Sequence, residues 1–558
     1  MTNEAIANNF SLLSKLMDIH GENSFKAKAY ANAAFTIEKL PVELTEMPEN
    51  KIASIKGLGE SIAKKISEQI QTGQLFQLNE LIAKTPIGVI EMLKIKGLGA
   101  KKISTIWKEL EIENLGELLY ACNENRLLLY KGFGEKTQQN IKEAIEFYFA
   151  SSGKFLYAQI EFFAGELDKI LKENFKEYLF EITGNFKRHL EIIEKLEWVT
   201  TCSTSQLKNF FTEKKFETVE EKENFISLKN KENVQIEFYC SDEKNFYPHV
   251  FHTNGSEEFL SEWKNLFSGD EQKIYSSEEE IFSSHNVQFI PAYLRETKKI
   301  IQQGIEKKLP VVIQPQDVKA IIHSHSKWSD GRFSIEDMAK ATIAKGLEYL
   351  VISDHSKSAF YANGLNEERI IAQHNEINEL NKQFHPFKIF KSIECDILND
   401  GNLDYSNGVL QSFDVVIASI HSNLKMSEEK AMMRLLRAIE NPYTSILGHL
   451  TGRLLLSRNG YLVDHTKIID ACAANDVVIE LNANPVRLDI DWRWIDYALN
   501  KNVLISINPD AHSIVGFDDI KYGVLAAQKA GLTKERNLSS FSLNDFEKFI
   551  AQQQLKRN

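Results

Sequence analysis

Apolar residues recur at three- and four-residue spacing from residue 1 to about 145, for example in ANNFSLLSKLMDIH and ENLGELLYACNENRLLLY. This spacing is typical of amphipathic helices, so the amino-terminal quarter is predicted to be helical throughout. From about 150 to 310 the pattern is mixed, with short apolar runs such as VQIEFYC between charged helical stretches. The segment IEKKLPVVIQPQDV, which holds two of the eleven prolines, is predicted to be a connector.

A different pattern begins at Lys319, where seven apolar runs recur at intervals that leave room for a helix. They are VKAIIHSH, LEYLVISDHS, FKIFKSIECDI, FDVVIASIHS, TSILGHL, DVVIELNAN and NVLISINPDAH. Strands that alternate with helices predict βα units in a parallel arrangement, and seven units can close a barrel. Six of the seven runs end in His, Asp or Glu, and barrel active sites lie at the carboxyl ends of the strands. We therefore expect these side chains to share one site.

The polar residues at these strand ends are candidate metal ligands. They are His323, His325, Asp330, His355, Glu394, His421, His449, Asp510 and His512. An ion with an open position takes three or four protein ligands, so this set predicts two or three divalent ions. Imidazoles mixed with carboxylates suit zinc, manganese or iron, and Cys395 is expected to point to the opposite face of its strand. One histidine after a strand is usually a satisfied polar residue; the recurrence at six strand ends favours a metal site.

A short motif repeats within the helical region. IKGLGESIAKKI (55–66) is followed by IKGLGAKKISTI (95–106) and by a weaker copy, YKGFGEKTQQNI, from Tyr130. A GxG turn lets backbone N–H groups at a helix start approach a phosphate, and nearby lysines add charge. The repeats predict helix-hairpin-helix modules that contact the DNA backbone without reading bases. The predicted contacts are Gly57, Gly59, Lys64, Lys65, Gly97, Gly99, Lys101 and Lys102.

Composition sets the cellular context. The net charge of −12 argues against a chain that coats nucleic acid indiscriminately, but leaves local phosphate-binding surfaces open. The cysteines lack CxxC spacing, which favours a reducing compartment. They are Cys122, Cys202, Cys240, Cys395 and Cys472. Neither a signal peptide nor a membrane-length apolar stretch is recognisable, so a cytoplasmic location is expected and no membrane partner.

Several of these motifs resemble a known domain. HSHSKWSDG, ISDHS, Glu394 in SIECDIL, ASIHS, LGHLTGR and PDAH resemble the successive motifs of the PHP (polymerase and histidinol phosphatase) domain, a distorted seven-stranded barrel with up to three metals. SDHSKSAFYANGLNEERI, HLTGRLLLSRNGYLVD and ELNANPVRLDIDWRW resemble, more narrowly, the PHP domain of bacterial family X DNA polymerases. That family also begins with helix-hairpin-helix repeats, so the resemblance spans essentially the whole chain.

The resemblance implies a multidomain architecture. It comprises an all-α amino-terminal region, an α+β nucleotidyltransferase-like middle and a carboxyl-terminal distorted (β/α)7 barrel. The expected domains are a first helix-hairpin-helix domain at 1–85, a second, fingers-like one at 86–150, a polymerase palm at 151–240, a thumb-like domain at 241–312 and the PHP domain at 316–558. Lys65 lies where some family X polymerases place a Schiff-base lysine, but a phosphate contact is the favoured interpretation.

Roles at the metal site follow from chemistry and from the resemblance. Metal ions lower the pKa of bound water to about 7 and clamp a phosphoryl group, so phosphate ester hydrolysis is the expected reaction. Glu394 is expected to bridge two ions, since it is the central carboxylate, and the catalytic group is predicted to be Glu394, His355 and Arg453. Lys357, Arg453 and Arg487 follow strand ends and are predicted to bind phosphate oxygens. Loop charges or structural ion pairs are the equally weighted alternative.

The middle region departs from the polymerase pattern. Family X polymerases carry a motif resembling ITGSFRRG, a GDxD aspartate pair and a third aspartate, which hold two magnesium ions. Here ITGNFKRHLEIIEKLEWV places Asn185 at the serine and Lys195 and Glu197 at the aspartate pair, with Gln235 at the third position. No aspartate lies between Lys169 and Ser241. Because the ions need several carboxylates, polymerase activity is predicted to be absent.

Three functions are compatible with these observations. The leading hypothesis is a DNA-binding, metal-dependent phosphoesterase that acts in DNA repair as a 3′-5′ exonuclease or 3′-end processing nuclease. A small-molecule phosphatase of the histidinol phosphatase type is a second, although such an enzyme needs no DNA-binding arm. A non-catalytic DNA-binding scaffold is the third, and the full ligand set argues against it.

Overall fold

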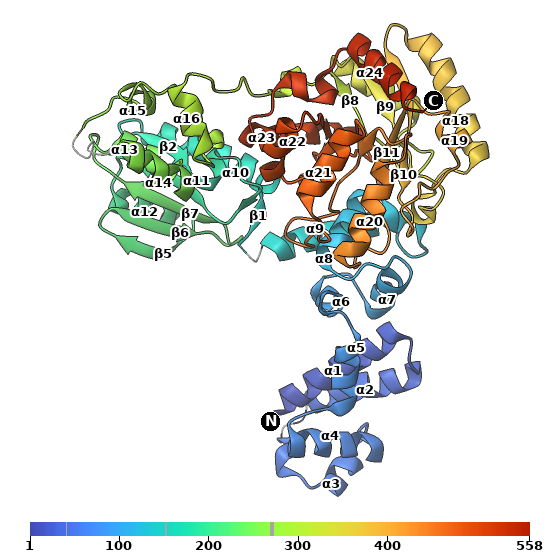
Figure 1. Cartoon of the computed structure of the whole chain (residues 1–558). Helices are drawn as coiled ribbons and strands as arrows, with labels where there is room; N and C mark the ends of the chain where they lie inside the picture. The colour runs from blue at the N-terminus through green and yellow to red at the C-terminus, as the bar shows by residue number, and fades with distance from the viewer. Residues whose placement is uncertain (39, 41, 151–152, 268–272, 558) are drawn as a thin grey trace. The chain divides into compact units, whose positions relative to one another are not determined.

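The computed structural model describes residues 1–38, 40, 42–150, 153–267 and 273–557 (Figure 1). The chain divides into two compact units, Met1–Tyr148 and Phe149–Asn558. Within the described ranges, no helix is both long enough and apolar enough to cross a membrane. The five cysteines are buried and free.

The first unit is helical, as the apolar spacing predicts. Its α-helices are α1 (Asn3–His20), α2 (Ser24–Glu38), α3 (Glu49–Ser54), α4 (Glu60–Thr72), α5 (Phe76–Lys84), α6 (Ile87–Glu91), α7 (Ala100–Lys108), α8 (Leu115–Asn123) and α9 (Glu135–Ala150), the last of which runs into the second unit. Three of them, α4, α7 and α9, begin directly after the second glycine of a GxG copy. The first glycines, Gly57, Gly97 and Gly132, have φ values of 98°, 90° and 97°, a conformation that side chains disfavour. The weaker third copy therefore forms the same turn.

The second unit begins with a mixed α/β region. Its elements are β1 (Phe155–Leu156), α10 (Tyr157–Asn174), β2 (Phe180–Thr183), α11 (Gly184–Lys187), β3 (Ile192–Ile193), β4 (Leu196–Thr200), α12 (Thr204–Glu213), β5 (Glu217–Lys222), β6 (Phe225–Lys229) and β7 (Gln235–Cys240). The five-stranded sheet has the order β2-β4-β7-β6-β5, with β4 and β7 parallel and the other neighbours antiparallel. Apolar side chains of α10 and α12 pack against it around Trp198.

Short helices connect this sheet to the barrel. They are α13 (Phe246–Thr253), α14 (Glu257–Leu266), α15 (Glu278–Ser283) and α16 (Lys299–Ile305). Their aromatic core includes Phe251, Phe259, Trp263 and Phe282. The guanidinium of Arg295 is fully buried there, where it pairs with Glu278 at 2.6 Å and lies over the ring of Phe282.

All seven predicted strands form, and they make one parallel sheet in sequential order from β8 to β14. The strands are β8 (Ala320–Ile321), β9 (Tyr349–Ile352), β10 (Lys388–Asp396), β11 (Val415–Ser419), β12 (Ile446–Leu447), β13 (Val478–Asn482) and β14 (Ile505–Asn508). A parallel bridge between Ser324 and Ala511 joins the two edges at their carboxyl ends, so the barrel is nearly closed. The expected (β/α)7 barrel is confirmed.

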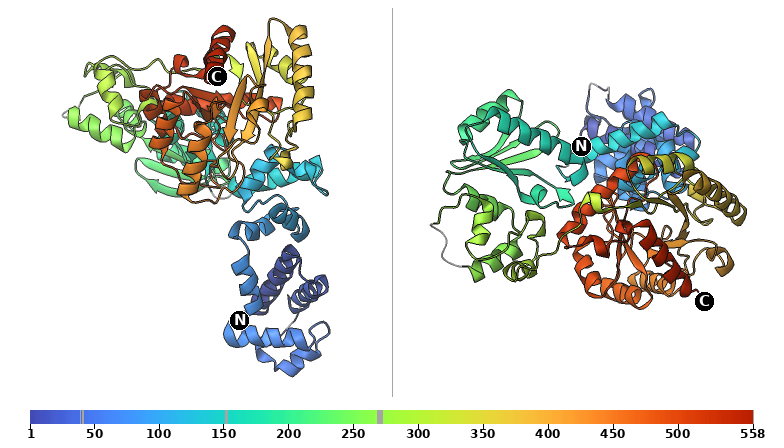
Figure 2. Two further views of the ribbon diagram at one scale, coloured as in Figure 1. Left: turned by 45° about the vertical axis from the view of Figure 1, so that its right-hand side comes forward. Right: turned by 90° about the horizontal axis from the view of Figure 1, so that it is seen from above.

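Helices surround the barrel, and the yellow-to-red ribbon in Figure 2 shows them outside the strands. They are α17 (Ile335–Ala344), α18 (Glu367–Phe384), α19 (Asn407–Leu410), α20 (Glu428–Ile439), α21 (His465–Ala474), α22 (Ile495–Asn500) and α23 (Ile520–Lys529). The last helix, α24 (Leu543–Leu555), packs against the inner core instead. Side chains alternate along each strand. Leu350 and Ile352 join the core under the outer helices, whereas Tyr349 and Val351 join an inner core with Phe546 of α24.

The same alternation makes the barrel interior polar toward the carboxyl ends of the strands. On β10, Phe390 belongs to the inner core, and the period of two places Glu394 on the same side. Cys395 joins the outer core, which confirms its predicted orientation. The interior is thus apolar where α24 packs and acidic at the opposite end.

Candidate metal centre

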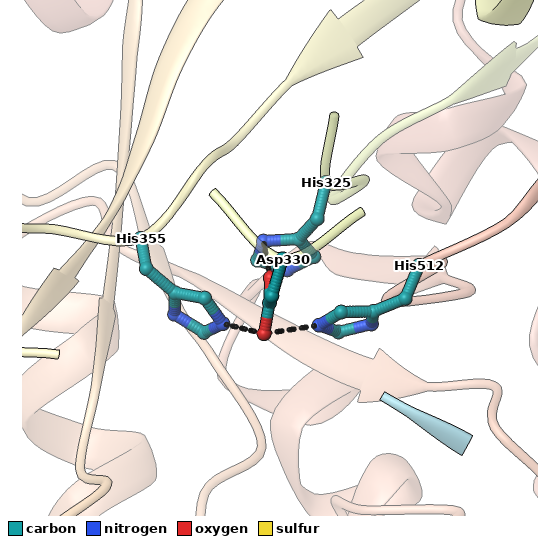
Figure 3. Close-up of side chains that lie close together, drawn as sticks. All are labelled: His325, Asp330, His355 and His512. Carbon is teal, nitrogen blue, oxygen red and sulfur yellow. Dashed lines mark ion pairs between the residues drawn. The ribbon is translucent and has the colours of Figure 1, made fainter. Parts of the chain in front are cut away.

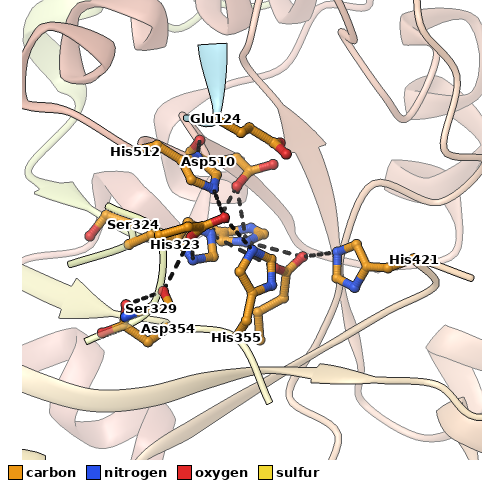
Figure 4. A network of polar contacts seen from close by, with 12 residues as sticks. Glu124, His323, Ser324, Ser329, Asp354, His355, His421, Asp510 and His512 are labelled. Atoms are coloured by element: carbon orange, nitrogen blue, oxygen red, sulfur yellow. Dashed lines mark hydrogen bonds and ion pairs between the residues drawn. The ribbon is translucent and has the colours of Figure 1, made fainter. Parts of the chain in front are cut away.

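The nine predicted ligands lie at the carboxyl ends of the barrel strands or just after them. Figure 4 shows five of them close together: His323, His355, His421, Asp510 and His512. Eight of them fall into three overlapping groups whose ligand atoms lie within 4.8 Å of one another. The groups are His325, Asp330, His355 and His512; His323, His325, Glu394 and Asp510; and His355, Glu394 and His421. The ninth, His449, has its Nε2 3.0 Å from Glu394 Oε1.

Asp330 is the centre of the first group (Figure 3). Its Oδ2 lies 3.5 Å from His355 Nε2 and 3.4 Å from His512 Nε2. The tight loop that carries Asp330 depends on Gly331, because a Cβ there would lie 2.0 Å from the carbonyl oxygen of His325. The sequence HSHSKWSDG therefore folds back so that its second histidine faces its aspartate, with His325 Nδ1 4.0 Å from Asp330 Oδ1.

Glu394 is the centre of the other two groups. Its Oε1 lies 3.1 Å from His421 Nε2 and 3.3 Å from His323 Nε2. Its Oε2 lies 2.9 Å from His355 Nδ1 and 3.7 Å from His325 Nε2. Each carboxylate oxygen therefore faces a different set of imidazoles, which is the geometry that a bridging ligand requires.

Two ligands have an unusual backbone conformation at the seam of the barrel. His323 follows β8 with φ 64°, and Asp510 follows β14 with φ 50°. Left-handed φ values are uncommon outside glycine and cluster at functional sites. At His323 the turn interrupts the alternation of β8, which would otherwise place this ring outside with Ile321. Its Nε2 instead lies 3.4 Å from Asp510 Oδ1.

The site is acidic as well as rich in imidazole. Burial alone would raise the pKa of Glu394, but His421, His323 and His355 hold it well below its ordinary value. Burial opposes the charge of His323, yet Glu480, Asp510 and Glu394 raise its pKa. Burial and the neighbouring His512 and His355 lower the pKa of His325 to about 3. Anionic carboxylates beside a neutral imidazole form a donor set suited to cations.

The side chains fit divalent ions. Within the described ranges, several buried atoms of the cluster have no hydrogen-bond partner of acceptable geometry: His323 Nε2, His325 Nδ1, both ring nitrogens of His355 and Glu394 Oε2. An unsatisfied buried polar atom costs about 1–3 kcal/mol. Metal coordination by these atoms would remove that cost.

A surrounding layer of polar side chains was not anticipated from the sequence. Glu480 Oε1 lies 2.6 Å from His323 Nδ1 and accepts a hydrogen bond from Asn508 Nδ2 at 2.8 Å. Asp396 Oδ1 lies 3.1 Å from His421 Nδ1. Glu480 belongs to DVVIELNAN, the run whose end carries no ligand, but its position on the inner face of β13 could have identified it by alternation.

Asp354 supports the loop that carries the first ligands. Its carboxylate accepts hydrogen bonds from the backbone N–H and the hydroxyl of Ser326 at 2.8 and 2.7 Å, and from Gln373 Nε2 at 2.6 Å. Burial raises the pKa of Asp354, while the hydrogen bonds from Ser329 and Ser326 oppose the shift. The SDH motif thus supplies one predicted ligand, His355, and one supporting carboxylate.

The predicted phosphate contacts have other partners. Arg453 donates from Nε to the carbonyl of Arg487 at 2.9 Å, from Nη1 to Asp491 at 2.5 Å and from Nη2 to the carbonyl of Leu488. Lys357 Nζ lies 2.7 Å from Glu367 Oε1, and Arg487 is buried. Arg453 therefore holds the loop after β13 in place. Its proposed catalytic role and the phosphate contacts of these three residues remain predictions.

The polymerase-like sheet carries a second charged cluster. Lys195 Nζ lies 3.2 Å from Glu197 Oε1 and 2.6 Å from Glu237 Oε2. Glu237, which the sequence analysis missed, is the direct neighbour of Glu197 in the β4–β7 ladder. Gln235 Nε2 donates to Glu237 Oε1 at 2.9 Å, and Asn185 accepts from Arg188 at 2.7 Å. The site thus holds two glutamates and one ammonium.

The hairpin lysines lie in the first unit on α4 and α7. Lys64 and Lys101 are exposed, and Lys65 and Lys102 are partly buried. Lys65 Nζ lies 3.9 Å from Glu68, and Lys102 Nζ lies 6.0 Å from the ring centroid of Phe133 in the third GxG copy. Because each lysine follows a GxG turn by a few residues, charge lies close to the backbone N–H groups of a helix start.

Comparison with known families agrees with this geometry. The PHP domain matches residues 322–484, a helix-hairpin-helix domain matches residues 1–75, and a SAM-like helix-hairpin-helix tandem matches residues 89–146. A barrel with a multinuclear ligand cluster and a PHP match defines the class of metal-dependent phosphoesterases.

The relatives define the family. The chain is 33% identical to the DNA polymerase/3′-5′ exonuclease PolX of Bacillus subtilis (strain 168), over 97% of each chain. It is 25% identical to a probable phosphatase of Thermoanaerobacter sp. (strain X514), over 39% of this chain and 89% of that protein. A probable phosphatase of Caldanaerobacter subterraneus is 28% identical over 29% of this chain and 60% of its own length. The chain belongs to the PolX family of PHP-containing DNA polymerases.

Proposed function

We propose that this protein is a metal-dependent 3′-5′ exonuclease or 3′-end processing enzyme of DNA repair, and that its active site is the ligand cluster of the PHP barrel. The observation that carries the proposal is the position of Glu394 between two sets of imidazoles. The exonuclease assignment draws on the name of the Bacillus subtilis relative. A cytoplasmic location is expected for such an enzyme.

We assign two or three ions, zinc or manganese, with iron as an alternative, to the nine ligands. Divalent ions at such a site activate water and offset the negative charge of a phosphate. The chain's own residues have distinct parts: Glu394 joins the imidazole sets, His355 lies between Asp330 and Glu394, and Glu480 orients His323. The hairpins are proposed to hold the DNA backbone through the glycine turns and lysines.

We further propose that the palm has lost polymerase activity. The ammonium of Lys195 lies between the carboxylates of Glu197 and Glu237, where it neutralises charge that a metal ion would need. Partial burial opposes this charge, but the hydrogen bond to Glu237 and the charge of Glu197 raise the pKa of Lys195. The lysine therefore remains an internal cation at neutral pH.

The test combines metal analysis with a panel of DNA substrates. Purified protein is analysed for zinc, manganese and iron, and is then incubated with 3′-labelled single-stranded, duplex and gapped DNA. We expect bound metal, stepwise loss of 3′ nucleotides and inhibition by chelators. Hydrolysis of a small phosphate monoester without hydrolysis of DNA would favour the phosphatase alternative, for which the similarity to probable phosphatases is the specific observation.

A further inference from the structure

A pocket of about 630 Å³ opens on the same rim of the barrel as the metal centre. Most of its lining comes from residues 451–465, which begin two residues after His449. Asp491 and Trp494, which follow β13, line another side. Both segments leave carboxyl ends of barrel strands, and this is the end at which barrels bind substrates. Thr451 connects them, because its N–H and hydroxyl donate to Asp489 at 2.9 and 3.0 Å.

The lining combines aromatic surface with guanidinium groups. His465 and Trp494 stack with their ring centroids 4.6 Å apart and their planes 3° from parallel. Arg458 donates to the carbonyl of Gly452 at 2.8 Å, which holds its guanidinium against the loop. Leu462, which also lines the pocket, is 72% exposed. Planar rings, apolar groups and arginine are the combination that binds unpaired nucleobases beside their phosphates.

The polymerase-like region contributes one residue to the lining. Ile192 of β3 lines the pocket, and the adjacent Glu191 pairs with Arg493 at 3.1 Å. A second junction fixes the same segment, because Lys529 Nζ donates to the carbonyl of Arg188 at 2.8 Å and to Glu296 at 2.7 Å. The side chain of Lys529 is completely buried. The segment 188–192 is thus held against the barrel by the buried amine of Lys529 and by the partly exposed pair of Glu191 with Arg493.

We propose that this pocket binds the nucleoside of the DNA residue next to the phosphate that is cleaved, and that the polymerase-like region serves the nuclease by contributing Ile192 to that subsite. The volume lies within the range of small-molecule sites, about 300–1,000 Å³. The lining begins at Thr451, two residues after the predicted ligand His449, and we place the phosphate at the ligand cluster and the base in the pocket on one strand end. This inference rests on the proposed function.

The experiment measures nucleotide binding separately from hydrolysis. Binding of dAMP to the full chain is measured by calorimetry in the presence of EDTA, with deoxyribose 5-phosphate as the probe that lacks a base. The variants are Trp494→Ala and Leu462→Ala, and the matched control is Leu555→Ala, whose side chain is 73% exposed on α24. Because Leu462 is largely exposed, its replacement tests the pocket even if the Trp494 variant is unstable.

We expect dAMP to bind, deoxyribose 5-phosphate to bind more weakly, and each pocket variant to lose about tenfold in affinity, the size of one lost base contact. On 3′-labelled single-stranded DNA the same variants should raise KM by a similar factor and leave kcat within about twofold. Equal dAMP affinity in wild type, pocket variants and control would overturn the inference. If the protein binds dAMP in this pocket but cleaves no DNA, the proposed function is overturned, while the assignment of the pocket as a nucleotide-binding site stands.

Discussion

The ring Nδ1 of His323 lies 2.6 Å from Oε1 of Glu480, and both side chains are fully buried. A carboxylate at this position fixes the tautomer and the orientation of the imidazole. We predict that Glu480→Gln lowers metal affinity by about 10- to 100-fold. The measurement is metal content after equilibrium dialysis against graded zinc or manganese. Glu547→Gln, whose side chain on α24 is 45% exposed, is the control, and equal metal retention by both variants would argue against a supporting role.

Loss of a central ligand should have a larger effect. Glu394→Gln and His323→Ala are each expected to lower DNA hydrolysis by more than about a hundredfold, since even a supporting side chain has effects of that size. DNA binding by the hairpins should persist because they lie in the other compact unit. Hydrolysis and DNA binding are measured on the same preparations. Added manganese should restore DNA hydrolysis by chelator-treated wild type but not by the two variants. A Glu394→Gln protein with wild-type activity would place the reaction elsewhere.

The hairpin glycines should separate into two kinds. Gly57 and Gly97 have φ values of 98° and 90°, so alanine there should weaken both the fold of the hairpin and DNA binding. Gly59 and Gly99 have negative φ values and open space around a Cβ, so alanine at either position should leave the stability of the hairpin unchanged. It should weaken DNA binding only if a DNA phosphate contacts the backbone at that glycine.

Fluorescence anisotropy across a salt series measures this binding. The affinity should fall linearly with salt on logarithmic axes, because counterions are released from the phosphates. It should be equal for unrelated sequences of one length. Affinity that does not respond to salt would contradict backbone contacts through these hairpins.

The cluster of Lys195, Glu197 and Glu237 predicts the absence of template-directed synthesis. Primer extension on gapped DNA with magnesium or manganese should yield no product with wild type. It should also yield none with Glu394→Gln, in which the proposed nuclease can no longer degrade an extended primer. Lys195→Asp, which replaces the internal cation by a carboxylate beside Glu197 and Glu237, should allow this sheet to bind manganese. Extension by the Glu394→Gln variant at the rate of an ordinary polymerase would disprove the assignment.

Lys529 predicts a pH dependence of stability. Burial lowers its pKa from 10.5 to about 8, although Glu296 opposes the shift. Between pH 8 and 10.5, this amine binds more protons in the unfolded chain than in the folded chain. The contribution of Lys529 to the free energy of unfolding therefore rises with pH over this range, and it is lost as the pH falls through 8. In Lys529→Met this titration is missing.

The free energy of unfolding of wild type should therefore increase relative to that of Lys529→Met as the pH rises from 8 to 10, by up to about 1.4 kcal/mol per pH unit. Lys548→Met, whose side chain is 64% exposed, is the control and should show a constant difference. A constant difference for Lys529→Met as well would show that the buried amine does not titrate in this window.

The local pattern of the sequence determined the seven strands, the helical amino-terminal unit and the nine ligand positions. Periods of 2 and 3.6 residues are properties of single elements, so they can be read along the chain. The ends of parallel strands meet at one rim in any barrel, which is why the residues after the runs could be grouped into one site before their distances were known.

The tertiary structure decided which carboxylates face which ligands. Glu480 and Glu237 lie within strands. Alternation places Glu480 on the inner face of β13, but only the neighbouring strands decide that it lies beside His323 and that Glu237 lies beside Lys195. Likewise, Arg453 follows a strand end as a phosphate contact would, but the loop after β13 supplies carbonyl and carboxylate partners for its guanidinium. The sequence determines on which side of a strand a residue lies. The partner that it meets across the barrel depends on the strand register and on the path of the loops, and long-range packing determines both.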